Sequence, residues 1–265
     1  MVVKNKRFKR LHKSFPSHSK IYVCGTSGSM KHFPWHLLNN KVVVGLNDVI
    51  KIYPVNYHHF SDKGLYIYYK SLNLEDRTTA VVCRIESIRG LRFNKASFLD
   101  RLYRYDWSTR PTLRHTNRLF CRRTVALSGV ELAWKLGADK IYLLGIDGCR
   151  PPGKNTYYVH GGASDWKKYL EPEESVSALC GKVKQLNTRG SLDKTCQLIL
   201  EHRICLERRH LEWYEDFSTL RAFHDRIRSG LRIINLSPVS IFDQWERKDP
   251  WKHFGIRYED WPVYG

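Results

Sequence analysis

The sequence predicts an α/β fold, with a single Rossmann-like domain around a mostly parallel sheet, and two observations predict it. First, residues 128–137 have the pattern of a helix ending at Gly137, and they lead directly into an apolar strand at 140–148. A helix followed at once by a buried strand is the repeating half of a parallel α/β sheet. Second, other short apolar runs end in small or polar residues, as strands that lead into loops do.

The remaining elements of the first half follow along the chain from a basic N-terminal segment. Residues 1–19 have no apolar period and are expected to form a flexible arm. Strands are predicted at 21–24, 42–46, 55–60 and 80–83. A helix is expected near 63–74. Residues 84–124 are crowded with Arg and poor in Gly and Pro, so we expect an irregular or short-helical surface region there.

The second half contains a long loop, a helical region and a last strand. Residues 150–173 hold Pro, Gly, Tyr and His without a period, which is typical of a loop or lid over strand ends. From 173 to 230 the pattern is helical, with breaks expected at Gly190 and near Ser218, which would cap a helix ending at Gly230. The last strand is predicted at 231–236. The domain is therefore expected over 20–265, with 150–215 as lid and helical insertion.

Charge and cysteine content narrow the function classes. The 265 residues include 45 Lys and Arg against 26 Asp and Glu, a formal net charge of +19 that attracts nucleic acid, anionic lipid or acidic glycans. The 7 cysteines form no CxxC pair, so neither a disulfide framework nor a structural zinc site is indicated. No signal peptide and no apolar stretch of roughly 18 residues is present, so we expect a cytoplasmic protein.

Small and polar residues follow several of the predicted strands. The loop Gly25-Thr26-Ser27-Gly28-Ser29 offers backbone N–H groups and hydroxyls suited to a phosphate, although a tight strand-to-helix turn explains it equally well. It matches neither the dinucleotide fingerprint nor a P-loop. The other strand ends carry Asn47-Asp48, Ser61-Asp62, Asp147, and Asn235 with Ser237-Pro238. We expect these groups to share one rim as a ligand crevice, while each has an alternative role as a helix cap.

Four of these pieces together resemble the Campylobacter-type sialyltransferases and their wider relatives. Cys24–Met30 is similar to the first glycine-rich loop of that family, and Val44–Asn47 to a strand that ends in a cytidine-contacting Asn. Ser128–Asp147 resembles the most recognisable block of the family, and Leu236–Ser240 its closing strand and nucleotide loop. The pieces lie in family order and span most of 20–245.

The resemblance implies a glycosyltransferase that uses a nucleotide-sugar donor, CMP- or UDP-linked, in a metal-independent, inverting transfer with no further cofactor. Two tyrosines under the lid, Tyr157 and Tyr158, would steady the leaving phosphate. The general base would be His210, with His160 as second choice. The absence of an Asp-x-Asp triplet agrees with metal independence. The predicted donor-binding residues are Gly25, Thr26, Ser27, Gly28, Asn47, Asp62, Ser128, Gly129, Asp147, Asn235, Ser237 and Pro238.

The Arg-rich stretch between Arg84 and Arg123 predicts a nucleic-acid surface. Its arginines alternate with Phe93, Tyr103, Tyr105, Trp107 and Phe120, and guanidinium groups grip phosphates while aromatic faces stack on exposed bases. A basic, solvated face is the alternative. The predicted DNA-binding residues are Arg84, Arg89, Arg92, Arg101, Arg104, Arg114, Arg118, Arg122, Arg123, Arg208 and Arg209.

Three functional hypotheses are compatible with these residues. The first is a DNA-modifying glycosyltransferase, of viral origin, that moves a sugar such as arabinose to a hydroxymethylated pyrimidine. The second keeps the fold and the donor but sends the sugar to a surface glycan or lipid-linked saccharide. The third is a non-catalytic DNA-binding module on a transferase scaffold.

Overall fold

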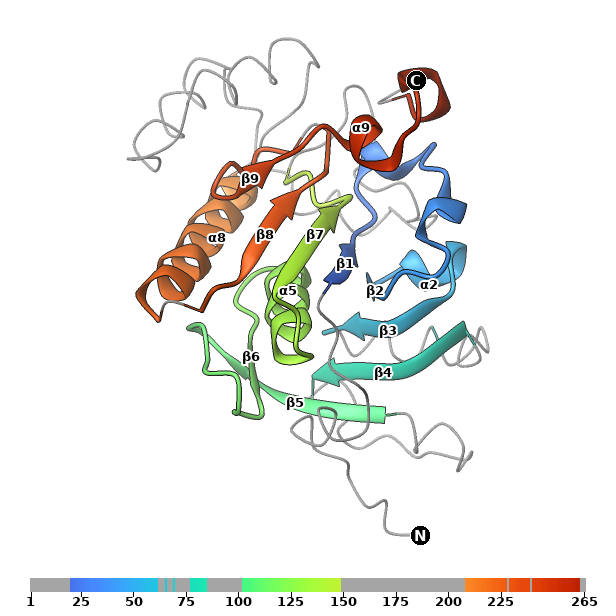
Figure 1. The fold of residues 1–265 in the computed structure, drawn as a ribbon. Helices are drawn as coiled ribbons and strands as arrows, with labels where there is room; N and C mark the ends of the chain where they lie inside the picture. The colour runs from blue at the N-terminus through green and yellow to red at the C-terminus, as the bar shows by residue number, and fades with distance from the viewer. Residues whose placement is uncertain are drawn as a thin grey trace, which may run out of the picture. The chain divides into compact units, whose positions relative to one another are not determined.

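The structure is a computed structural model, and it describes residues 20–61, 65, 69, 77–84, 102–148, 208–227, 229–238 and 240–262 (Figure 1). The chain divides into two compact units, each made of several segments. The first unit consists of Met1–Gly25, Leu38–Ile141 and Ser229–Arg232, and the second of Thr26–Leu37, Tyr142–Arg228 and Ile233–Gly265.

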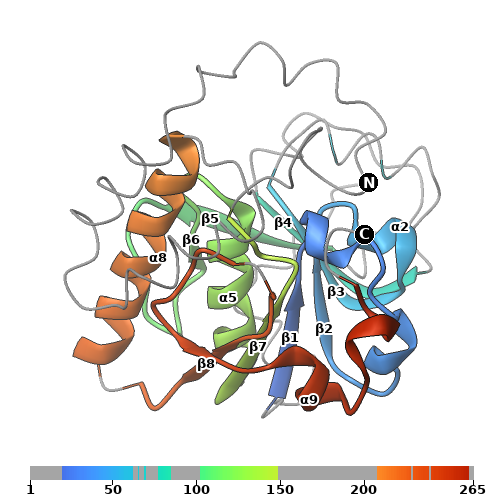
Figure 2. The same ribbon diagram turned by 90° about the horizontal axis from the view of Figure 1, so that it is seen from above.

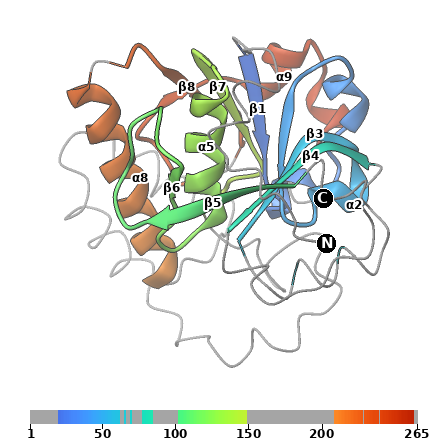
Figure 3. The same ribbon diagram turned by 90° about the horizontal axis from the view of Figure 1, so that it is seen from below.

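The first unit contains six parallel strands. They are neighbours in the order β6-β5-β4-β3-β2-β1, and every adjacent pair is parallel. Figure 3 shows β3, β4 and β5 side by side. Their bounds are β1 Lys20–Cys24, β2 Val43–Leu46, β3 Val55–Phe60, β4 Thr78–Arg84, β5 Leu102–Ser108 and β6 Arg118–Phe120. The four strands predicted before residue 84 are confirmed, because their apolar runs are buried as parallel strands require.

The prediction of an irregular or short-helical surface region at 84–124 is wrong for the strands β5 and β6, whereas residues 109–117 and 121–124 are irregular. β5 and β6 both lie in that stretch, and Leu102, Tyr103 and Tyr105 of β5 are buried. Aromatic residues at 103, 105 and 107 alternate here with Arg104 and Asp106, so the strand period is present in the sequence.

Helix α5, Val125–Lys135, covers part of this sheet and packs against β1, β2, β3 and β6 (Figure 2). The helix begins three residues before the predicted start, because the Thr124 side chain accepts a 3.2 Å hydrogen bond from the Ala126 N–H as an N-cap. Gly137 follows its end at φ 106°, which confirms the predicted glycine stop.

Two buried residues of opposite charge on α5, Glu131 and Lys135, hold the loop between β5 and β6. Glu131 accepts hydrogen bonds from the backbone N–H of Thr112, at 2.5 Å, and of Phe120. The Lys135 ammonium donates to the Thr116 hydroxyl at 2.8 Å and to the Arg118 carbonyl at 2.6 Å. Burial raises the pKa of Glu131, and the positive charge of Lys135 opposes that rise.

The second unit contains the remaining strands, wholly or for the most part. β7 (Lys140–Leu144), β8 (Arg232–Asn235) and β9 (Glu246–Arg247) are neighbours in that order, and β8 and β9 are parallel. The predicted strands at 140–148 and 231–236 are therefore confirmed with shorter bounds. Parallel strands joined through helices establish the α/β fold class. The extent of a single domain over 20–265 stays a prediction.

Helix α8, Arg208–Arg226, corrects one prediction of the sequence analysis. The helix is continuous through Ser218, which was expected to start a new helix ending at Gly230. The Ser218 hydroxyl donates to the Tyr214 carbonyl one turn earlier, at 3.0 Å, so this serine satisfies its hydrogen bond inside the helix.

Short helices complete the described residues. They are α2 Val49–Ile52, α9 Pro250–Phe254 and the 3-10 turns Gly28–Met30, Trp35–Leu38 and Tyr258–Asp260. In the part of the chain that the structure describes, no helix has both the length and the apolar character needed to cross a membrane.

Replacing Lys135 by Met should destabilise the protein by about 3 kcal/mol, because it leaves the Glu131 carboxylate buried beside an apolar group. Urea unfolding measures the loss. A Lys135→Met variant as stable as the wild type would contradict this account of the β5–β6 loop.

Candidate functional site

Small or polar residues follow three neighbouring strands of the first unit. Gly25 follows β1, Asn47 follows β2 and Ser61 follows β3. Because β1, β2 and β3 are parallel, their carboxyl ends lie at one edge of the sheet, which is where open α/β sheets bind ligands. The prediction that these strand ends share an edge is confirmed for these three residues. Asp62 lies outside the described residues.

Asn47 has an unusual backbone conformation at this edge. Its φ is 47°, in the left-handed region that residues other than glycine seldom adopt. Two hydrogen bonds to β3 hold it there, from the Asn47 N–H to the His59 carbonyl at 3.0 Å, and from His58 Nε2 to the Asn47 carbonyl at 3.0 Å. Both backbone polar groups of Asn47 are thus satisfied by the neighbouring strand.

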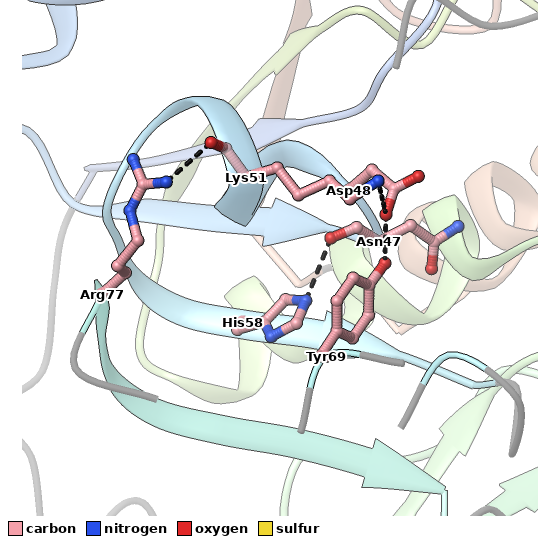
Figure 4. Close-up of polar contacts among 6 residues, drawn as sticks. All are labelled: Asn47, Asp48, Lys51, His58, Tyr69 and Arg77. Atoms are coloured by element: carbon pink, nitrogen blue, oxygen red, sulfur yellow. Dashed lines mark hydrogen bonds and ion pairs between the residues drawn. The ribbon is translucent and has the colours of Figure 1, made fainter. Parts of the chain in front are cut away.

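The side chain of Asn47 is not satisfied in the same way. Its Oδ1 atom is buried and has no hydrogen-bond partner. Figure 4 shows the amide extending away from the His58 ring. A buried acceptor left without a donor costs about 1–3 kcal/mol. Asn47 therefore combines a strained backbone with an unmet need for a donor, which is typical of a ligand-binding position.

Asp48, the next residue, is buried and held by its neighbours (Figure 4). The Tyr69 hydroxyl donates to Asp48 Oδ1 at 2.9 Å, and the Lys51 ammonium lies 3.5 Å from the same oxygen. Arg77 Nη1 donates to the Lys51 carbonyl at 2.6 Å. The negative charge of the Asp48 carboxylate is therefore paired within the protein, and the carboxylate fixes the turn that follows Asn47.

Two adjacent histidines of β3 are buried and neutral. Burial lowers the pKa of His58 to about 3 and that of His59 to about 4. The His58 ring must carry its proton on Nε2, because the Asn47 carbonyl can only accept. His59 donates from Nδ1 to the Val82 carbonyl at 3.0 Å and accepts at Nε2 from the Ser128 hydroxyl at 2.7 Å.

Neither histidine was predicted from the sequence to have a functional role. The available signal was a pair of adjacent histidines within a predicted strand, because buried imidazoles need hydrogen-bond partners.

The predicted donor-binding residues of α5 have roles within the fold. Ser128 is fully buried, and its hydroxyl is the donor to His59. At Gly129, a Cβ atom would lie 2.6 Å from Leu46 Cδ2 and 3.3 Å from Val23 Cγ1, so glycine permits close packing of helix on sheet. Packing alone explains both residue types, and their contact with a donor stays a prediction.

In the second unit, Asp147 organises the glycine-rich loop. The Ser29 hydroxyl and N–H donate to the two Asp147 carboxylate oxygens at 2.7 and 3.1 Å, and the Asp147 N–H donates to the Ser27 hydroxyl at 3.2 Å. The Ser27 N–H donates to the Gly145 carbonyl at 3.2 Å. These serines are buried together with Gly25, Thr26 and Gly28, and their side chains are engaged inside the protein.

Hydrogen bonds within the protein also hold the loop after β8. The Ser237 hydroxyl accepts from the Ile146 N–H at 3.0 Å, and the Ser237 N–H donates to Asn235 Oδ1 at 3.0 Å. The Arg247 guanidinium donates to the carbonyls of Pro238, at 3.2 Å, and Ser240, at 2.9 Å. Contact of Asp147, Asn235, Ser237 or Pro238 with a donor stays a prediction.

Trp261 anchors the glycine-rich loop from the C-terminal segment, which sequence reasoning did not foresee. Its buried indole Nε1 donates to the Ser29 carbonyl at 2.6 Å, and its ring centroid lies 4.8 Å from that of Phe33. Trp251 Nε1 donates in turn to the Trp261 carbonyl at 3.1 Å. The only earlier signal was the concentration of Trp near the end of the chain.

The predicted catalytic residues are the least defined part of the site. Tyr157, Tyr158 and His160 lie outside the described residues, and of His210 only the backbone, in the first turn of α8, is described. Among the side chains that the structure describes, no three His, Cys, Asp or Glu residues are grouped to hold a metal ion. Metal independence and the identity of the base stay predictions.

The predicted DNA-binding arginines are scattered over several elements. Arg104 in β5 and Arg123 before α5 are half-buried, whereas Arg114, Arg118 and Arg122 are exposed. The Arg114 guanidinium lies 6.0 Å from the Trp134 ring centroid. Only the backbone is described for Arg84, Arg208 and Arg209, and outside the described residues lie Arg89, Arg92 and Arg101.

The aromatic half of the nucleic-acid prediction is wrong for three residues. Tyr103, Tyr105 and Phe120 are core residues, exposed by 2%, 0% and 1%, so they offer no face to a base. Trp107 is 42% exposed. Alternation along β5 places Trp107 and Arg104 on opposite faces of the strand.

Comparison with known proteins gives two solved structures of the kind that the sequence resembles. The sialyltransferase CstII from Campylobacter jejuni, in complex with a substrate analogue, cytidine-5'-monophosphate, is similar at 12% identity over 89% of this chain and 87% of its own, with a TM-score of 0.46. The monofunctional alpha-2,3-sialyltransferase Cst-I from Campylobacter jejuni is similar at 15% identity over 86% and 79%, with a TM-score of 0.46. No protein-family model and no curated protein matches the chain.

Acidification should destabilise the protein through His58 and His59. Their folded-state pKa values, about 3 and about 4, lie below the ordinary value of 6.5. Their contribution is present above pH 6.5 and is lost as the pH falls, because only the unfolded chain takes up the protons. Between pH 7 and about 5.5, each of the two should cost about 1 kcal/mol of the free energy of unfolding. His224, whose pKa burial also lowers, adds to the loss, and Glu131, whose pKa burial raises, opposes it. The difference in stability between the wild type and His59→Gln, measured by urea unfolding, should therefore change by about 1 kcal/mol over this range, and an unchanged difference would contradict a neutral His59.

Proposed function

We propose that this chain is a nucleotide-sugar-dependent glycosyltransferase whose donor nucleotide binds at the carboxyl end of β2. Four sequence pieces in the order of the sialyltransferase-like family support the activity. The parallel strands of the first unit support the location, because ligands of open α/β sheets bind beyond the carboxyl ends of the strands.

The buried, unpartnered Oδ1 of Asn47 is the observation that carries the proposal. An acceptor in this state is satisfied by a ligand that brings an N–H or O–H group. The exocyclic amine of cytosine is such a donor, and the N3–H of uracil is another. We favour a CMP-linked sugar over a UDP-linked one because the family that the sequence resembles has a cytidine-contacting Asn at the end of this strand.

The reaction itself follows the inverting course that the resemblance implies. The acceptor oxygen forms a bond to the anomeric carbon, and the bond from that carbon to the phosphate oxygen breaks with its electron pair remaining on the phosphate. His210, with His160 as the alternative, takes the proton of the acceptor hydroxyl. Tyr157 and Tyr158 steady the leaving phosphate, and no metal ion takes part.

For the acceptor, the proposal is a hydroxymethylated pyrimidine in DNA that receives a sugar such as a pentose. The net charge of +19 and the exposed Arg114, Arg118 and Arg122 support a polyanionic acceptor. Extruding a base from the duplex costs a few kcal/mol, which contacts to the DNA backbone must offset.

Asn47→Ala should weaken binding of CMP about tenfold, because it removes the acceptor for the base, and calorimetry measures the dissociation constant. Asn40→Ala is the matched control, since Asn40 is also left-handed, at φ 63°, but is exposed. Both substitutions disturb a left-handed backbone, and only the first should affect the nucleotide. Equal CMP binding by both variants would refute the assignment of Asn47.

Incubation with a panel of nucleotide-sugars and hydroxymethylated DNA should add the mass of one sugar to a pyrimidine nucleoside, as read by mass spectrometry after digestion. Parallel reactions contain oligosaccharides in place of DNA. Turnover of oligosaccharides alone would reject the DNA acceptor and leave a glycan transferase. DNA binding without any nucleotide binding would reject the enzyme and leave a binding module.

A further inference from the structure

We infer that His58 is a positioning residue that holds Asn47 in the conformation needed to bind the nucleotide, an inference that rests on the proposed function. His58 acts through the carbonyl of Asn47, and the described contacts give it no other polar task.

The strain at Asn47 needs a specific restraint. A left-handed backbone costs about 1–2 kcal/mol for a residue with a Cβ, somewhat less for Asn, and persists where its surroundings fix it. The two bonds at Asn47 come from successive residues of β3, one from the His59 backbone and one from the His58 ring. The bond from the ring is the one that depends on the residue type at position 58.

Water cannot replace the His58 donor. The ring is only 2% exposed, and it packs against Phe60 and Tyr69 with centroid separations of 4.9 and 4.6 Å. Its neutral state leaves a single N–H, and the Asn47 carbonyl fixes that proton on Nε2. Removing the ring nitrogen would leave the carbonyl of a strained residue without its donor.

Tyr69 joins the two residues of the turn. Its ring stands edge-on to His58, and its hydroxyl donates to Asp48 Oδ1 at 2.9 Å (Figure 4). One aromatic ring therefore fixes both the imidazole that restrains Asn47 and the carboxylate of the residue after it. The backbone of Asn47 and of the residue after it is held, so the direction in which the Asn47 side chain leaves the backbone is set before a ligand arrives.

The test compares CMP binding by His58→Leu, His58→Gln and Leu102→Ala. His58→Leu removes the donor and should raise the CMP dissociation constant about tenfold, the equivalent of one lost hydrogen bond. His58→Gln carries an amide N–H near the position of Nε2 and should restore binding to within about threefold. Leu102→Ala, in buried β5, loses stability without touching Asn47 and should bind CMP as the wild type does.

Hydrogen exchange of the Asn47 backbone amide, measured by NMR, gives a second readout. The N–H should exchange faster in His58→Leu than in Leu102→Ala, because only the first variant releases the turn. If His58→Leu does not fold, His58→Asn, whose shorter amide does not reach the carbonyl, takes its place.

Three results would overturn the inference. They are wild-type CMP affinity in His58→Leu, a failure of Gln to rescue, and equal weakening by Leu102→Ala. If the wild-type protein binds no nucleotide, the proposed function fails, and the Asn47 exchange rate alone decides whether His58 holds the turn.

Discussion

The parallel pairing of β2 with β3 is the constraint on which the arrangement at Asn47 depends. In this register Leu46 lies opposite His59, so that Asn47 reaches the carbonyl of His59 and the ring of His58. A slip of β2 by one residue along β3 would move the Asn47 carbonyl away from the His58 ring and the Asn47 N–H away from the His59 carbonyl. The register is thus fixed by buried polar groups as well as by apolar packing.

Local sequence patterns predicted the strands whose residues are nearly all buried, and they failed for the strand in which buried and exposed residues are mixed. The strands β1 to β4, β7 and β8 are short apolar runs, and their sequences identify them directly. In β5 the buried Tyr103 and Tyr105 alternate with charged residues. This alternation is the side-chain period of a strand, and it was overlooked because the surrounding stretch is rich in arginine. Ser218 was interpreted as a cap because serine favours that position, but tertiary packing of Tyr214 and Phe217 keeps α8 continuous.

The candidate site shows a similar division between local and distant information. Asn47 was identifiable because a polar residue directly follows a strand. His58 contacts Asn47 across 11 residues of sequence, and Tyr69 contacts Asp48 across 21. No local sequence pattern encodes such contacts. The serines of the glycine-rich loop were predicted to bind the donor. Within the fold, the Ser29 hydroxyl donates to the buried Asp147 carboxylate, which would cost several kcal/mol without donors, and the Ser27 hydroxyl accepts from the Asp147 N–H.

The distribution of charge and aromatic surface determines how a polyanion would be held. Exposed arginines occur before, within and after β6, while Tyr103, Tyr105 and Phe120 are committed to the core. Trp107 is exposed, but it projects from the face of β5 opposite to Arg104. The described residues therefore offer little surface for stacking on bases, and with the proposed DNA acceptor these arginines would contact phosphates. Binding of that kind would release counterions, read no sequence directly and weaken steeply with salt.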